Sequence, residues 1–102
     1  MVKRKKGVKR EPLLEMYEAI LTLETTEECV NFFDDLCSVT ELSAIEQRFQ
    51  VARLLGEGHI YNSILEQTGA SSATISRVNR SLHDGKGAYE MVFKRLDEKK
   101  RG

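Results

Sequence analysis

The chain has 102 residues, 40% of them hydrophobic, with 16 acidic and 16 basic side chains, as in an ordinary single globular domain. No apolar run approaches the roughly 18 residues of a membrane span, and no apolar segment follows the basic N-terminus as it would in a secretory signal. We therefore expect a cytoplasmic protein with no membrane partner. In that compartment Cys29 and Cys37 are expected to be buried, reduced thiols rather than a disulfide or a metal site.

Charge is distributed unevenly along the chain. Residues 11–46 hold ten acidic side chains and no lysine or arginine, whereas residues 3–10 hold six basic ones. Residues 1–10 are predicted to form a disordered basic arm, which is either a tail without contacts or an arm that binds phosphates or a minor groove. A single helical domain is expected over residues 11–97, followed by a charged tail over residues 98–102.

The first part of this domain predicts two helices. Pro12 fits the first turn of a helix that begins near Glu11, and residues 13–23 are apolar on most sides, so this helix needs burial all round. Thr25 and Glu28 have the spacing of a capping box that opens a second helix. Apolar residues then repeat at helical spacing at Cys29, Phe32, Phe33 and Leu36.

Four more helices are expected after these. Thr40 is predicted to cap a long helix that runs to about residues 56–58, with one apolar stripe at Leu42, Ile45, Phe49 and Ala52. Two short helices follow at about 60–68 and 72–83, and a last one runs from Ala88 to a charged tail from Asp97 onward. The fold class is therefore all-α, with six helices. The first and third helices carry more apolar surface than one chain covers, which favours a homodimer with interlocking N-terminal helices.

The two short helices have the pattern of a helix-turn-helix. Gly69 falls at the turn, where the backbone favours positive φ, and either Ser71 or Ser72 caps the second helix. Leu65 occupies a position where a small residue is commoner, and it either turns outward or splays the two helices. The predicted buried contacts are Ile64, Ala70, Ile75 and Val78.

The second helix of this pair has a face suited to the major groove of DNA. No carboxylate occurs between Glu66 and Asp84, and small side chains flank two arginines. Small residues let a helix backbone approach base edges, and arginine pairs with guanine. A merely solvated helix face is the alternative for the two arginines. The predicted DNA-binding residues are Ser71, Ser72, Ala73, Ser76, Arg77 and Arg80.

With these segments placed, the chain resembles the tryptophan-repressor-like family, and more closely its YerC/YecD branch. The similarity is carried by Gln47-Arg48, by Thr68-Gly69-Ala70-Ser71 and by the run from Ala73 to Val78, and it extends over about residues 12–96. The resemblance implies an all-helical, intertwined homodimer that presents two helix-turn-helix heads to a pseudo-palindromic operator, with repression as the expected mode.

The chain departs from the family where tryptophan binds. The family holds the amino acid's carboxylate with one arginine from the long helix and another from the second helix of the pair, and a glycine follows the latter. Here Arg77 matches the second arginine, but Val78 replaces the glycine and Gln47 replaces the first arginine, with Arg48 one step further on. Tryptophan is therefore not expected to be an effector, and no other effector is indicated.

The function predicted from the sequence is sequence-specific DNA binding by a homodimeric transcriptional regulator. The alternative is a protein-interaction module that uses the same surface for a protein partner. An enzyme is not expected, because no catalytic set, cofactor motif or metal-ligand cluster is visible. His59 and His83 are interpreted as a loop residue and a helix-end residue.

Overall fold

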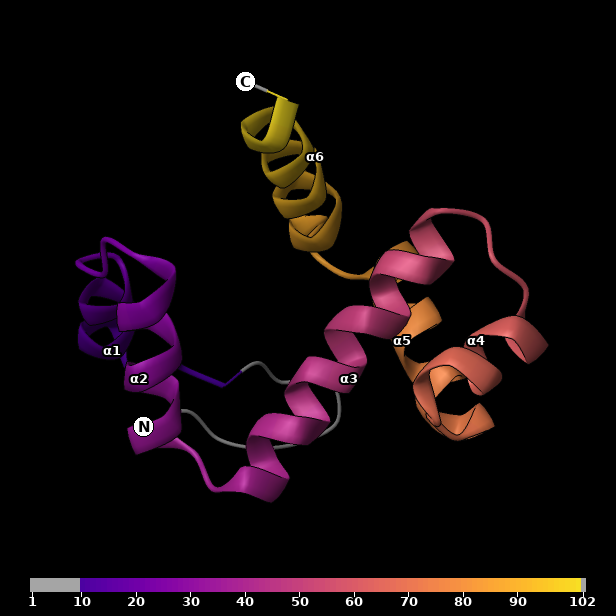
Figure 1. Cartoon of the computed structure of the whole chain (residues 1–102), viewed down its shortest axis with the longest axis horizontal. Helices are drawn as coiled ribbons and strands as arrows, with labels where there is room; N and C mark the ends of the chain where they lie inside the picture. Colours follow the sequence, from indigo (N-terminus) through magenta and orange to yellow (C-terminus); the bar gives the residue numbers. More distant parts are fainter. Residues whose placement is uncertain (1–9, 102) are drawn as a thin grey trace. The chain divides into compact units, whose positions relative to one another are not determined.

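The computed structural model describes residues 10–101, and these form six helices and no strand (Figure 1). They are α1 (Leu14–Ile20), α2 (Thr26–Leu36), α3 (Val39–Gly56), α4 (Tyr61–Thr68), α5 (Ser72–Asp84) and α6 (Ala88–Arg101). The predicted all-α class with six helices is confirmed. The helices form two compact units, one through Ser38 and one from Val39. The predicted basic arm, Arg10 apart, lies outside the described residues.

In the first unit, α1 is shorter than the apolar run suggests. The predicted start near Glu11 was wrong: α1 begins only at Leu14, and Leu13 before it is extended and offers no side-chain cap, so Pro12 lies outside the first turn. The helix ends at Ile20, and the Thr22 hydroxyl then donates a hydrogen bond of 2.7 Å to the Ala19 carbonyl.

The capping box at the start of α2 is confirmed. The Thr25 hydroxyl accepts a hydrogen bond of 3.0 Å from the Glu28 backbone N–H, and the Glu28 carboxylate accepts one of 2.8 Å from the Glu24 N–H. Cys29 and Cys37 are free thiols, half-buried rather than buried as predicted. No residue of α1 or α2 is buried within the chain, which leaves the apolar faces of both helices without a core of their own.

The second unit is built on α3. This helix begins at Val39, so Thr40 lies in its first turn and the predicted cap at Thr40 was wrong. A second cap-type residue, Ser38, precedes the helix, and the sequence pattern does not rank two such residues so close together. Of the predicted apolar stripe, only Ala52 is buried, whereas Ile45 and Phe49 remain 43% and 41% exposed.

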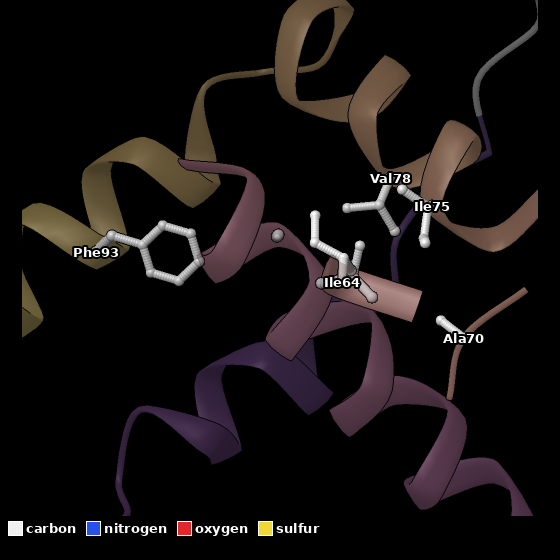
Figure 2. Close-up of a cluster of buried hydrophobic side chains, with 7 residues drawn as sticks. Ile64, Ala70, Ile75, Val78 and Phe93 are labelled. Carbon is white, nitrogen blue, oxygen red and sulfur yellow. The ribbon is translucent and has the colours of Figure 1, made fainter. Parts of the chain in front are cut away.

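The core of the described chain lies entirely in this second unit. The four predicted core residues of the helix-turn-helix are all buried, which confirms that prediction. Figure 2 shows Ile75 and Val78 of α5 beside Ile64 of α4, with Ala70 on the turn between the two helices. Residues of α3 and α6 complete the cluster, whose members are Val51, Ala52, Ile64, Ala70, Ile75, Val78 and Phe93.

The last helix packs on α3 through aromatic and charged contacts. The rings of Phe93 and Phe49 meet edge to face at a centroid distance of 5.3 Å, and the Arg53 guanidinium lies 4.9 Å from the Phe93 ring centroid. Arg53 also pairs with Asp97, and this hydrogen bond raises the pKa of Arg53 above its ordinary value. The predicted tail from Asp97 onward is instead helical, because α6 continues to Arg101.

Candidate nucleic-acid interface

The turn between α4 and α5 is fixed by hydrogen bonds of its own. Gly69 ends α4 in the left-handed conformation, with φ of 73°, and its N–H donates to the Leu65 carbonyl at 2.9 Å. The Thr68 hydroxyl donates to the Ile64 carbonyl at 2.7 Å and accepts from the Ala70 N–H at 3.0 Å. The prediction that Gly69 needs positive φ is therefore confirmed, and the turn has one defined geometry.

Ser71 is the residue that caps α5. Its hydroxyl oxygen accepts a hydrogen bond of 3.1 Å from the Thr74 N–H, and the same hydroxyl lies 3.1 Å from the Thr74 hydroxyl. Ser72 is the first residue of the helix, and its side chain is exposed. The sequence allowed either Ser71 or Ser72 as the N-cap, and the structure shows that it is Ser71.

The two sides of α5 have different chemistry. Ile75 and Val78 are buried, while all six residues predicted to bind DNA are exposed. Residues 73, 76, 77 and 80 recur at the three- and four-residue spacing that places side chains on one helix face, with the two serines at its N-terminal end. The structure thus brings the predicted residues together on the exposed side of a single helix.

The position of Leu65 is resolved by the structure. Its side chain is partly buried and packs against the core cluster, so the outward orientation is excluded. With Leu65 in this position, Gly69 still has the αL conformation and Ile64 is still fully buried. A leucine at this position is therefore compatible with the helix-turn-helix geometry of this chain.

A hydrogen bond that the sequence does not reveal joins α3 to the turn. The Gln47 side-chain amide donates to the Thr68 carbonyl at 3.2 Å. From the sequence, Gln47 is identified only as the residue that replaces the family's ligand-binding arginine. Its partner is a backbone atom 21 residues away, so no residue pattern could have identified the pair. Val78, the other substituted position, is 2% exposed and belongs to the core.

The two histidines and the largest described hollow do not involve the six predicted residues. The His83 ring lies 2.9 Å from the Asn79 carbonyl at the end of α5, and His59 lies in the loop after α3, as predicted for both. A hollow of about 390 Å³ is lined by Arg53, Glu57 and Asp97 among others, and none of the six predicted residues borders it. Within residues 10–101 no cluster of metal-ligating side chains occurs, and no helix is long and apolar enough to cross a membrane.

A short helix pair with a capped second helix, an αL turn and a shared core defines a helix-turn-helix protein. The chain belongs to the Trp repressor protein family, whose model matches residues 11–97. It is 50% identical over 84 residues to the uncharacterized protein YerC of Bacillus subtilis (strain 168), covering 82% of this chain and 81% of YerC. The family resemblance predicted from the sequence is therefore confirmed.

Two solved structures have the same fold. One is a Staphylococcus aureus protein provisionally assigned as a Trp repressor, with 52% identity, a TM-score of 0.81, and coverage of 83% of this chain and 85% of that one. The other is a TrpR-like protein from Eubacterium eligens ATCC 27750, with 47% identity, a TM-score of 0.81, and coverage of 83% and 88%. The predicted fold class is confirmed by both.

Proposed function

We propose that this chain is a cytoplasmic, sequence-specific DNA-binding regulator that represses transcription as a homodimer on a pseudo-palindromic operator. Residues 11–97 would supply both dimerisation and DNA reading. The observation that carries the proposal is the exposed face of α5, where six small or basic side chains lie opposite a buried apolar face. The family to which the chain belongs is one of DNA-binding regulators rather than enzymes, which supports the same conclusion.

The electrostatics of α5 support binding to a polyanion. Arg77 and Arg80 are exposed, and no acidic residue occurs between Glu66 and Asp84, although the whole chain has no net charge. DNA affinity depends mainly on the basic groups that reach phosphates, so a local surplus of positive charge matters more than the total. Ser72, Ala73 and Ser76 are short enough to let the helix backbone approach the floor of the groove.

The homodimer is supported by apolar side chains that the chain leaves in solvent. Leu13, Leu14 and Leu21 are 69%, 63% and 83% exposed, and no residue of α1 or α2 is buried. Apolar surface on this scale is commonly covered by a partner. A two-fold dimer would also present two copies of α5, with half-sites about one helical turn apart, ~34–36 Å centre to centre.

The proposed regulator does not respond to tryptophan. The Gln47 amide is already bonded to the Thr68 carbonyl, and a neutral amide cannot replace an arginine in an ion pair with a carboxylate. Val78 puts a branched side chain where the family has glycine, and that side chain is part of the core.

Selection of bound sequences from a random pool of duplex DNA tests the function directly. A two-fold-symmetric consensus is the expected result. On that site, Arg77→Ala should cost roughly 1–3 kcal/mol per half-site and relax the preference at one base pair, if Arg77 pairs bidentately with guanine. Arg77→Lys retains the charge but not the bidentate geometry, so it should lose the base preference while leaving the salt dependence of binding unchanged.

Substitution of Arg80 should affect DNA binding differently from substitution of Arg77. Arg80 lies one turn further along α5, where a phosphate contact is expected. Arg80→Ala should therefore weaken binding to all sequences alike and lower the salt slope by about one unit for each phosphate that the variant no longer neutralises. Arg95→Ala, which removes an exposed arginine from α6, is the matched control for total charge. If selection yields no consensus and both α5 variants match the control, the surface serves a protein partner instead.

A further inference from the structure

The side-chain hydrogen bond from Gln47 reaches the turn of the reading head, the helix pair α4 and α5. Gln47 is half-buried on α3, and its acceptor, the Thr68 carbonyl, belongs to the last residue of α4. Gly69 follows directly in the left-handed conformation, and Ser71 then caps α5. The Thr68 carbonyl therefore lies immediately before the residue at which the chain turns toward α5.

Two further hydrogen bonds of Thr68 join this contact to the rest of the turn. The Thr68 hydroxyl donates to the Ile64 carbonyl and accepts from the N–H of Ala70, which is buried. The apolar contacts of Ile75 and Val78 hold α5 against α3 and α4, but such contacts are non-directional and tolerate small sliding movements. A hydrogen bond is sensitive to both distance and angle, so the Gln47 amide restricts the movement that the core alone allows.

The polar side chain at this point is already bonded within the protein. Among the described residues, no buried side-chain nitrogen or oxygen lacks a hydrogen-bond partner. The Gln47 amide has its acceptor within the protein, and Val78, on the buried face of α5, is part of the core. A ligand that entered between α3 and α5 at this point would have to displace protein contacts that are already made.

We propose that Gln47 is a positioning residue that holds α5 in its DNA-binding orientation through the Thr68 carbonyl, so that no ligand is needed at the point between α3 and the turn where its amide is bonded. This inference rests on the proposed DNA-binding function and adds the residue that fixes the orientation of the DNA-binding helix.

Two substitutions at Gln47 test this role. Gln47→Met has similar length but no donor, and Gln47→Asn keeps the amide but is too short to reach the Thr68 carbonyl. Both should weaken binding to the selected DNA by roughly three- to tenfold, the effect of losing one partly buried hydrogen bond. Gln50→Met makes the same change at an exposed position on the same helix and should bind like the wild type.

Hydrogen exchange distinguishes positioning from general stability. In both Gln47 variants the Gly69 and Ala70 amides should exchange several-fold faster, while core amides such as that of Val51 keep their protection. Wild-type affinity and exchange in both variants would overturn the role of Gln47. Using two chemically different replacements keeps the test valid if one of them fails to fold.

The independence of DNA binding from a ligand at the Gln47 position has its own test. Wild-type protein that has been unfolded, dialysed and refolded should bind the selected DNA with the same dissociation constant as before. Loss of affinity that a low-molecular-mass extract restores would overturn the inference. Wild-type protein that selects no DNA sequence would refute the proposed function itself, whereas protein that selects DNA but is unaffected at Gln47 would refute only this inference.

Discussion

The cap of α5 separates the structural role of one serine from that of its neighbour. Ser71 accepts a hydrogen bond from the Thr74 N–H, whereas Ser72 is exposed in the first turn. Removing an N-cap side chain costs about 1 kcal/mol, within a range of roughly 0.5–2. Ser71→Ala should therefore lower the free energy of unfolding by about 1 kcal/mol per chain, or about 2 per dimer. Ser72→Ala should change it by less than about 0.5 kcal/mol per chain.

Urea unfolding at a fixed protein concentration measures both effects. The concentration must be fixed because the apparent stability of a dimer depends on it. The midpoint should fall for Ser71→Ala with an unchanged m-value. Ser71→Asp adds a sharper contrast, because aspartate is a good N-cap and should keep the stability, while its negative charge should weaken DNA binding. A larger loss of stability for Ser72→Ala than for Ser71→Ala would refute the assignment of the cap.

Two further predictions concern assembly and the effector. Sedimentation at micromolar concentration should give about twice the chain mass of 11.6 kDa. Replacing Ile20 or Phe33 by glutamate should unfold the protein rather than release folded monomers, because an unpaired charge would be buried. A well-folded wild-type monomer would contradict this. Calorimetry with millimolar L-tryptophan should show no saturable heat, and a dissociation constant in the micromolar range would show that the Gln47 and Val78 positions can still form the pocket.

Features governed by short-range interactions could be predicted from the sequence. The Thr25–Glu28 capping box, the left-handed glycine at position 69 and the buried face of α5 each depend on residues within about one helical turn. The exposure of the predicted DNA-binding residues follows from the same periodicity. Local signals therefore specified both the existence of the helix pair and the side of α5 that faces solvent.

Features that depend on competition or on distant residues could not be predicted. Ser38 and Thr40 are both cap-type residues, and the pattern favoured the wrong one. The apolar run after Pro12 gave no sign that the helix begins only after Leu13. The bond between Gln47 and Thr68 joins residues 21 positions apart, so only the packing of α3 against the end of α4 reveals it.

The distribution of the core supports the proposed dimer. The seven buried residues found among residues 10–101 all lie in the second unit, so the described part of the first unit has no interior of its own. α1 has seven residues, and isolated helices shorter than about 12–15 residues are marginal in water. Burying one leucine side chain contributes about 1.5–3 kcal/mol, and Leu13, Leu14 and Leu21 are largely exposed in the single chain. The first unit therefore needs a covering surface to be stable. A second copy of the chain is the partner that would supply it while also pairing the two reading heads. Association and the folding of α1 and α2 are then expected to occur together.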